Sequence, residues 1–439
     1  MFNTVTFKPA NHSPRFIMAL GILCLLVIGV ALPGPSIHGL LRAQETASTP
    51  AATLPVNWTV SSPAYAEVER LITQKLQRAI AAGDIPGAVL IAGTTNETLL
   101  LGAVGHRRLV PTVEPLQTDD IFDLASLTKP LATTLAVMKL IDQGKLKLDE
   151  PVAKHWPEFG CEGKESITPV DLLLHRSGLI ADNALGDYLL GPEVAWQKIA
   201  ALKLRQPVGT KFAYSDMGLL VMGKVVEKIG GQPLNQLCAS EIYQPLGLER
   251  TGYLPPAAWA EKLVPTEGLP GGVHDPRAAR LGGVAGHAGL FSDAQGVAQL
   301  SRAILRSLKA DAPAEPQSPR LFSRTTALLM TAPHNIPDPP LADAKPAIRA
   351  LGWDMRSPYS SNRPTRMSDR AIGHGGFTGT TLWIDPERDL FVCILSSRLH
   401  PDGKGQINAL ARELGDDILQ QFDALQPAPP SNQVAPRPR

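Results

Sequence analysis

Ser126 and Lys129 form a Ser-x-x-Lys pair at the start of a predicted helix. A strand-like run over residues 119–125 precedes the serine, and a helical pattern continues from Ser126 to Gln143. Because residues three apart share one face of a helix, the lysine can reach the serine hydroxyl. The helix N-terminus adds partial positive charge and free backbone N–H groups. The pair could therefore be a serine nucleophile and its base.

A serine hydroxyl is a poor nucleophile at neutral pH. Acyl transfer also needs a base, a proton donor for the leaving group and N–H donors for the oxyanion. Lys129 could be the base if it is neutral, since burial or neighbouring cations can lower a lysine pKa from about 10.4. The alternative is that Ser126 caps the helix and Lys129 is solvent-exposed. The pair alone leaves both interpretations open.

A second candidate motif is Tyr214-Ser215-Asp216, which lies between a loop and a helix predicted over 217–229. The tyrosine phenol could relay a proton between the serine, the lysine and the leaving group. Asp216 could accept a hydrogen bond from Lys129 and hold it in place. Ser215 or Asp216 could also cap the following helix, and the two roles are compatible.

The third candidate is Gly-His-Gly-Gly-Phe-Thr-Gly-Thr at residues 373–380, on a predicted strand. Glycines on a strand let a ligand approach the backbone closely. Such an edge could pair with an amide-bearing substrate, and the N–H groups of Phe377 and Ser126 could bind the oxyanion. The alternative is a glycine-rich turn with a surface histidine, His374.

Together and in this order, the three motifs resemble those of the serine β-lactamase and penicillin-binding protein superfamily, whose signatures are S-x-x-K, S-D-N and K-T-G. The resemblance is to class C β-lactamases and D-alanyl-D-alanine carboxypeptidases, and it spans about residues 64–425. It implies an α/β (α+β) fold of the β-lactamase/transpeptidase type. In that fold an antiparallel sheet is flanked by helices and carries an inserted, mostly helical lobe, here at about 126–340.

The resemblance also implies the chemistry: a serine hydrolase that works through an acyl-enzyme, with no cofactor and no metal. The resemblance implies that Ser126 is the acylated nucleophile and that Lys129 and Tyr214 transfer protons. It also implies that Asp216 belongs to this catalytic group. The residues implied for substrate binding and the oxyanion are His374, Gly375, Gly376 and Phe377.

Two positions depart from the superfamily signatures. Asp216 replaces the usual asparagine, and its negative charge would favour the ammonium form of Lys129. His374 replaces the lysine of K-T-G, which removes a permanent cation for a substrate carboxylate. The expected substrates are D-amino-acid amides of peptidoglycan-type peptides, with short-chain esters or β-lactams as alternatives. A hypothesis of another class is a non-catalytic cell-wall or β-lactam sensor.

A further glycine-rich block, residues 281–292, resembles a run in membrane-linked penicillin-binding proteins and related cell-wall hydrolases. Its glycines predict a tight loop before a helix that starts near Asp293. His287 within it could face the cleft or be hydrogen-bonded inside the loop. We see no His-Glu-x-x-His motif and no Cys/His set at ligand spacing, so no metal site is predicted.

Hydrophobic periodicity predicts the surrounding elements. A helix over 64–82 and a hairpin of strands over 88–93 and 98–105 precede the Ser-x-x-Lys pair. Strands over 371–374, 380–384 and 390–396 and a closing helix over 406–425 follow the helical middle, which implies a mixed sheet completed by distant residues. The helices predicted in the middle are 126–143, 169–174, 194–204, 217–229, 234–243, 294–308 and 325–331.

Composition and the chain ends indicate export. The chain has 439 residues with a net charge of +1, which gives no basic footprint for nucleic acid. Residues 16–32 are apolar, so residues 1–32 are predicted to be a signal peptide or N-terminal membrane anchor. We expect a periplasmic or extracellular enzyme, with a flexible linker over 33–63 and a disordered Pro-rich tail over 426–439. The cysteines predict no disulfide framework.

Overall fold

The computed structural model describes residues 54–267, 271–310, 320–336 and 347–426. The predicted leader, residues 1–32, and all of the predicted tail after its first residue lie outside the described residues. Within the described ranges, no helix is both long enough and apolar enough to cross a membrane.

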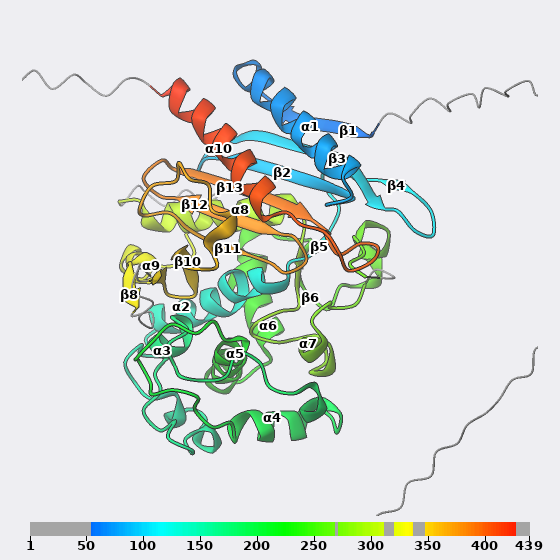
Figure 1. Ribbon diagram of the computed structural model, residues 1–439. Helices are drawn as coiled ribbons and strands as arrows, with labels where there is room; N and C mark the ends of the chain where they lie inside the picture. The colour runs from blue at the N-terminus through cyan, green and yellow to red at the C-terminus, as the bar shows by residue number, and fades with distance from the viewer. Residues whose placement is uncertain (1–53, 268–270, 311–319, 337–346, 427–439) are drawn as a thin grey trace, which may run out of the picture. The chain divides into compact units, whose positions relative to one another are not determined.

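One antiparallel sheet frames the domain (Figure 1). Its strands lie in the order β1-β3-β2-β13-β12-β11-β10-β9-β8, and β4 pairs with β3. Every pair of its described strands is antiparallel, so the mixed sheet expected from periodicity is wrong and the antiparallel sheet is confirmed. The strands are β1 Val56–Ser61, β2 Gly87–Gly93, β3 Thr98–Arg108, β4 Glu114–Pro115, β8 His334–Ile336, β9 Ala347–Ala350, β10 Trp353–Arg356, β11 Ile372–Gly375, β12 Thr381–Asp385 and β13 Leu390–Ser396.

Helices cover both faces of this sheet. α1 (Ala66–Ala81) and α10 (Asn408–Leu425) pack together on one face, while α8 (Ala294–Leu308) lies against β2 and β13 on the other (Figure 1). Every residue of β2 and β13 is buried. Burial on two faces explains why these strands are continuous apolar runs rather than alternating ones.

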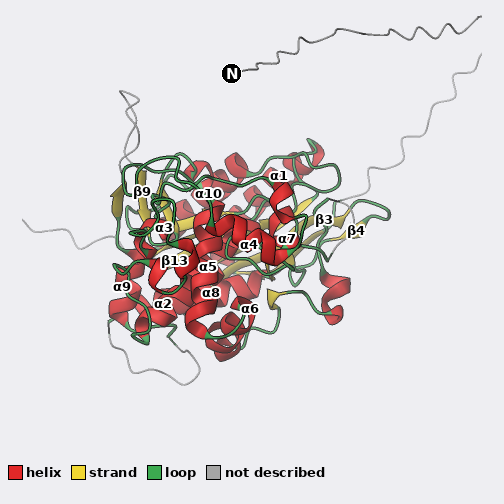
Figure 2. Cartoon of the chain, turned by 90° about the horizontal axis from the view of Figure 1, so that it is seen from below, coloured by secondary structure: helices red, strands yellow, loops and turns green. Residues whose placement is uncertain are grey.

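A mostly helical lobe is inserted between the hairpin β2–β3 and the last strands, as expected. Seen from below, its helices α4, α5 and α7 lie in front of the strands (Figure 2). The helices between β5 and β8, other than α8, are α2 Leu135–Asp142, α3 Pro169–Leu173, α4 Pro192–Ala200, α5 Asp216–Gly230, α6 Leu234–Cys238, α7 Pro276–Arg280 and α9 Arg324–Thr331.

A small second sheet holds the segment just before Ser126. Its order is β5-β7-β6, formed by Phe122–Asp123, Leu290–Ser292 and Thr251–Tyr253. β5 is only two residues long, whereas the sequence predicted a strand over 119–125. The pairing of β5 with β7 nevertheless fixes the chain immediately upstream of the serine.

The segment that carries Ser126 and Lys129 is not a simple α-helix. It begins as a 3-10 turn over Ala125–Leu127, continues as a π-helix over Lys129–Thr134, and becomes α-helical only in α2. Pro130 has no N–H and therefore cannot donate the α-helical bond to Ser126, which explains the irregular start. The predicted α-helix over 126–143 is wrong in its first turns.

The predicted linker over 33–63 also differs from the structure. Residues Val56–Ser61 of it form β1, which pairs with β3 at the edge of the sheet. Trp58 contacts this edge where Gly102 has no side chain, since a Cβ on that glycine would lie 2.4 Å from the indole. The segment near the N-terminus is rich in small residues, so its composition did not predict a strand. This strand is stabilised by its pairing with β3.

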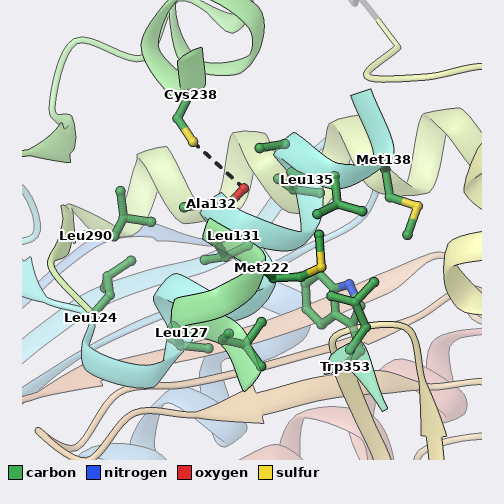
Figure 3. Packing of buried hydrophobic residues seen from close by; sticks show 14 of the residues in the cluster. Leu124, Leu127, Leu131, Ala132, Leu135, Met138, Met222, Cys238, Leu290 and Trp353 are labelled. Atoms are coloured by element: carbon green, nitrogen blue, oxygen red, sulfur yellow. Dashed lines mark hydrogen bonds between the residues drawn. The ribbon is translucent and has the colours of Figure 1, made fainter. Parts of the chain in front are cut away.

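The inner side of the serine-bearing segment is part of the hydrophobic core (Figure 3). Leu127, Leu131 and Leu135 have no measurable exposure and belong to one cluster with Met222 of α5 and Trp353 of β10. Each buried leucine contributes about 1.5–3 kcal/mol relative to exposure. The core therefore anchors the back of the segment, while its front is available for chemistry.

Candidate active site

Ser126 follows a residue in an unusual backbone conformation. Ala125 has a φ of +44°, a backbone conformation that residues other than glycine rarely adopt. Asp123 Oδ1 accepts a hydrogen bond from the Ala125 N–H at 2.8 Å and stabilises this turn. Such local strain costs on the order of 1–3 kcal/mol and persists where surrounding contacts determine it. The turn presents the Ser126 hydroxyl to a pocket.

Lys129 lies behind Ser126 with its ammonium group fully surrounded. Nζ is 2.8 Å from Ser126 Oγ, 2.7 Å from Asp216 Oδ1 and 3.3 Å from the His287 carbonyl oxygen. The serine hydroxyl and the carbonyl oxygen accept hydrogen bonds from the ammonium, whereas Asp216 pairs with it by charge without the geometry of a hydrogen bond. Lys129 is therefore not exposed to solvent, and the alternative interpretation is wrong.

The charge state of Lys129 follows from its neighbours. Burial alone would lower the pKa of this lysine, but the Asp216 carboxylate and Tyr214 outweigh burial and raise the pKa above its usual value. Lys129 therefore carries its proton at neutral pH. This agrees with the expectation that an aspartate in place of asparagine favours the ammonium.

Tyr214 completes this group. Its ring centroid is 4.9 Å from Lys129 Nζ. Burial raises the pKa of the phenol, and hydrogen bonds with Lys129 and Ser126 offset only part of that increase. The phenol is therefore neutral at neutral pH, within reach of both partners. Its ring lies between those of His175 and Tyr359, with centroid distances of 4.6 and 4.8 Å.

Ser215 both caps α5 and ties the second motif to His175. Its hydroxyl accepts a hydrogen bond from the Gly218 N–H at 3.1 Å, which confirms the predicted cap. Its own N–H donates to His175 Nδ1 at 3.1 Å. Burial, with Arg349 and Lys129 nearby, holds the pKa of His175 well below its usual value, so this ring is a neutral acceptor. Sequence reasoning missed His175, because nothing in its local motif marks it.

His374 of β11 is buried and neutral. Only 6% of the residue is exposed, which contradicts the surface-histidine alternative. Nδ1 is 2.8 Å from the Gly375 carbonyl oxygen, an acceptor, so Nδ1 carries the proton. Burial and the charges of Lys129 and Arg349 keep the pKa of His374 well below its usual value. The ring therefore supplies no cation to the site.

These groups meet at a pocket of about 690 Å³, a size suited to a small ligand. Lys129 and Asp216 are not among the residues that line it. The predicted site residues that line the pocket are Ser126, Tyr214, His374, Gly375, Gly376 and Phe377.

The backbone after His374 approaches the serine-bearing segment closely. A Cβ on Gly376 would lie 2.4 Å from the Leu124 carbonyl oxygen, so only glycine fits there. Thr378 Oγ1 donates to the Asp123 carbonyl oxygen at 2.8 Å. The turn after β11 and the residues before Ser126 are therefore held as one unit.

Arg349 of β9 is a pocket residue that the sequence analysis missed. It is buried, lines the pocket with Asp354 and Tyr359, and none of its three guanidinium nitrogens has a hydrogen-bond partner among the described residues. Asp354 Oδ1 is 3.4 Å from Nη1. The available signal was a charged residue inside an otherwise apolar run, residues 347–353.

Asp216, Asp275 and His287 are the described residues whose donor atoms are close enough to hold a metal ion, all within 4.8 Å of one another. Asp216 is already paired with Lys129, and His287 Nε2 is 2.9 Å from Asp275 Oδ1. A divalent cation here would be repelled by the adjacent ammonium. The cluster therefore fits an ion-pair network better than a metal centre.

Comparison with known proteins agrees with this geometry. The Beta-lactamase family model matches residues 68–416. The chain is 33% identical to an N-acetylmuramyl-L-alanine amidase of Bacillus subtilis (strain 168), over 75% of this chain and 81% of that protein. It is 31% identical to a protein of Salmonella agona (strain SL483) named as a D-alanyl-D-alanine carboxypeptidase, over 64% and 70%.

A penicillin-binding protein homologue from Caulobacter crescentus has the same fold. The TM-score is 0.64 at 20% identity, with 84% of this chain and 99% of that chain covered. The β-lactamase/transpeptidase-like fold is thus confirmed. The chain belongs to the beta-lactamase family and is a serine hydrolase of the β-lactamase superfamily.

Proposed function

We propose that this protein is a D,D-carboxypeptidase-like hydrolase of peptidoglycan-type peptides that end in a D-amino acid. Ser126 attacks the amide carbonyl and forms the acyl-enzyme, which water then hydrolyses. In the minor fraction of enzyme whose Lys129 is the neutral amine, that amine takes the Ser126 proton, and Tyr214 passes a proton to the leaving amine. The end of β11 and the turn after it, from His374 to Phe377, receive the substrate, with the Phe377 and Ser126 N–H groups on the oxyanion.

The observation that supports this substrate class is the buried guanidinium of Arg349, which has no hydrogen-bond partner among the described residues. A fully buried guanidinium without hydrogen bonds is costly, and such groups are normally satisfied by a partner. A carboxylate is the partner that matches its planar, bidentate geometry. A D,D-carboxypeptidase substrate places a carboxylate one residue beyond the scissile amide. Arg349 would thus replace the cation that is lost where His374 stands instead of lysine.

Asp354 lies beside Arg349 but makes no hydrogen bond with it. Its Oδ2 accepts a hydrogen bond from Ser360 Oγ at 2.7 Å, and its Oδ1 has no hydrogen-bond partner among the described residues. This acid can hold the guanidinium in place until a carboxylate arrives. The arrangement supports a site that orders Arg349 in advance of substrate binding.

Hydrolysis of an N-acyl-D-Ala-D-Ala peptide is to be compared with hydrolysis of the same peptide ending in a carboxamide. We expect wild type to prefer the free acid by about 10- to 100-fold in kcat/KM, as a charged hydrogen bond of about 1.5–3 kcal/mol implies. Arg349→Met should abolish that preference. It should still hydrolyse p-nitrophenyl acetate, which has no carboxylate.

Arg302→Met is the matched control, because Arg302 is a buried arginine that bonds to Thr94 and Thr98 and does not line the pocket. It should keep the preference for the acid. Equal rates on acid and carboxamide in the wild type, or turnover of only an N-acetylmuramyl peptide or an ester, would refute the proposed substrate class.

A further inference from the structure

The loop that contains His287 is wedged between the two helices that carry the first two motifs. Thr133 Oγ1, on the segment after Ser126, donates to the Gly286 carbonyl oxygen at 2.7 Å. A Cβ on Gly286 would lie 2.0 Å from the Leu219 carbonyl oxygen of α5. The loop backbone therefore contacts both helices directly and can set their relative position.

His287 makes two different contacts from this loop. Its backbone carbonyl accepts the Lys129 hydrogen bond at 3.3 Å, while its ring Nε2 is 2.9 Å from Asp275 Oδ1. The side chain is only 1% exposed. A single residue thus links the site lysine to a carboxylate outside the pocket.

Asp275 is fixed independently of His287. It caps α7, where its Oδ1 accepts the N–H groups of Arg277 and Ala278 at 3.0 and 2.8 Å. Burial would raise the pKa of Asp275, but the His287 hydrogen bond and charge and the α7 amide outweigh it and lower the pKa. The carboxylate is ionised, so His287 Nε2 is the donor in this bond.

We propose that His287 and Asp275 are positioning residues for the hydrolytic reaction. The bond between ring and carboxylate fixes the loop conformation in which the His287 carbonyl accepts from Lys129. With that acceptor and the Asp216 ion pair in place, an N–H of the ammonium is directed at Ser126 Oγ. Neither His287 nor Asp275 lines the pocket, so both act through Lys129.

The physical basis is the orientation of the ammonium. Lysine has a flexible stem and three equivalent donors, so one acceptor alone does not fix its direction. Two hydrogen bonds and an ion pair from three different residues do. Loss of the carbonyl acceptor would let the ammonium shift, and a misplacement of about 1 Å can cost about 100-fold in rate. Substrate affinity should be little affected, because neither His287 nor Asp275 lines the pocket.

The test uses p-nitrophenyl acetate, an activated ester, and so does not depend on the natural substrate. We expect His287→Ala to lower kcat and the rate of Ser126 acetylation by about 10- to 100-fold, with KM within about twofold of wild type. His287→Gln should recover most of the rate, since its amide N–H can still donate to Asp275. In the double variant with Asp275→Asn, the losses should not add.

His155→Ala is the matched control. His155 Nε2 is 2.8 Å from Glu150 Oε1, a bond of the same kind away from the pocket. The His155→Ala variant should leave kcat unchanged even if its unfolding temperature changes as much as that of His287→Ala. Should His287→Ala fail to fold, His287→Gln and Asp275→Asn, singly and combined, provide the same comparison.

Three results would overturn the proposal. The first is an equal kcat for His287→Ala and His155→Ala, or a loss that only tracks the unfolded fraction. The second is additive losses in the double variant. The third is inactivation of the wild type by EDTA with recovery on added Zn²⁺, which would make His287 and Asp275 metal ligands instead.

Discussion

Lys129 Nζ lies 2.7 Å from Asp216 Oδ1, with only 1% of the lysine side chain exposed. The resting enzyme therefore holds an ion pair where the superfamily signature would place a neutral asparagine. Since this carboxylate raises the pKa of Lys129, the amine form needed by a general base is scarce at neutral pH. Activity should accordingly rise with pH over the range in which the protein is folded.

Asp216→Asn removes the charge that holds the proton on Lys129. The pKa of the lysine should fall, so the ascending limb of kcat/KM against pH should move to lower pH by about one unit or more. The profile is to be measured with p-nitrophenyl acetate after subtraction of the uncatalysed rate. An unchanged limb in a folded variant would show that Lys129 is not the titrating base.

His374 should remain neutral, with its proton on Nδ1, throughout the physiological range. Burial and two nearby cations depress its pKa, so protonation should occur only well below the usual range. Nitrogen chemical shifts of the ring, followed by NMR from pH 5 to 8, should not change. A titration in that window would mean that His374 can supply the missing cation after all.

Gly286→Ala should destabilise the protein by about 1–3 kcal/mol, because the added methyl would meet the Leu219 carbonyl oxygen. The displaced loop should also lower kcat. Gly186→Ala is the control, since a Cβ there meets nothing within 4 Å. Urea unfolding and ester hydrolysis measure the two effects, and equal behaviour of the variants would contradict the tight packing of this loop.

The raised pKa of Asp120 predicts that the free energy of unfolding depends on pH. Burial raises the pKa of this carboxyl from 3.8 to about 6, although the Gln117 N–H and Arg107 partly offset it. Between these values the native state holds a proton that the unfolded state has lost. The free energy of unfolding should therefore fall as pH rises from about 4 to 6.

Asp120→Asn should remove this component. The difference in unfolding free energy, variant minus wild type, should increase between pH 4 and pH 6.5 in urea titrations. A difference that stays constant across this window would show that Asp120 has an ordinary pKa in the folded protein.

The sequence predicted the elements with strong local patterns. α1, β2, β3, α8 and β13 lie where their periodicity placed them, and Ser126, Tyr214 and the His374 strand meet at one pocket. The elements followed from hydrophobic periodicity, and the site residues followed from motifs that carry their own chemistry. The family resemblance then supplied the fold.

What the sequence did not predict depends on contacts between distant residues. Arg349 and His175 belong to no motif, and only β-sheet pairing and the α5 cap bring them to the site. The π-helical start at Lys129 follows from Pro130, whose effect on the helix was not anticipated. The sequence left open whether His287 faces the cleft or bonds within its loop. In the structure its ring bonds to Asp275, which caps α7, and its carbonyl oxygen accepts a hydrogen bond from Lys129.

The most direct test of the account is the identity of the acylated residue. The protein is to be mixed with p-nitrophenyl acetate, quenched in acid during the first turnovers, digested and analysed by mass spectrometry. We predict one acetyl group on the peptide that contains Ser126, and neither adduct nor turnover in folded Ser126→Ala. An acetyl group on another residue, or unchanged turnover by Ser126→Ala, would contradict the account.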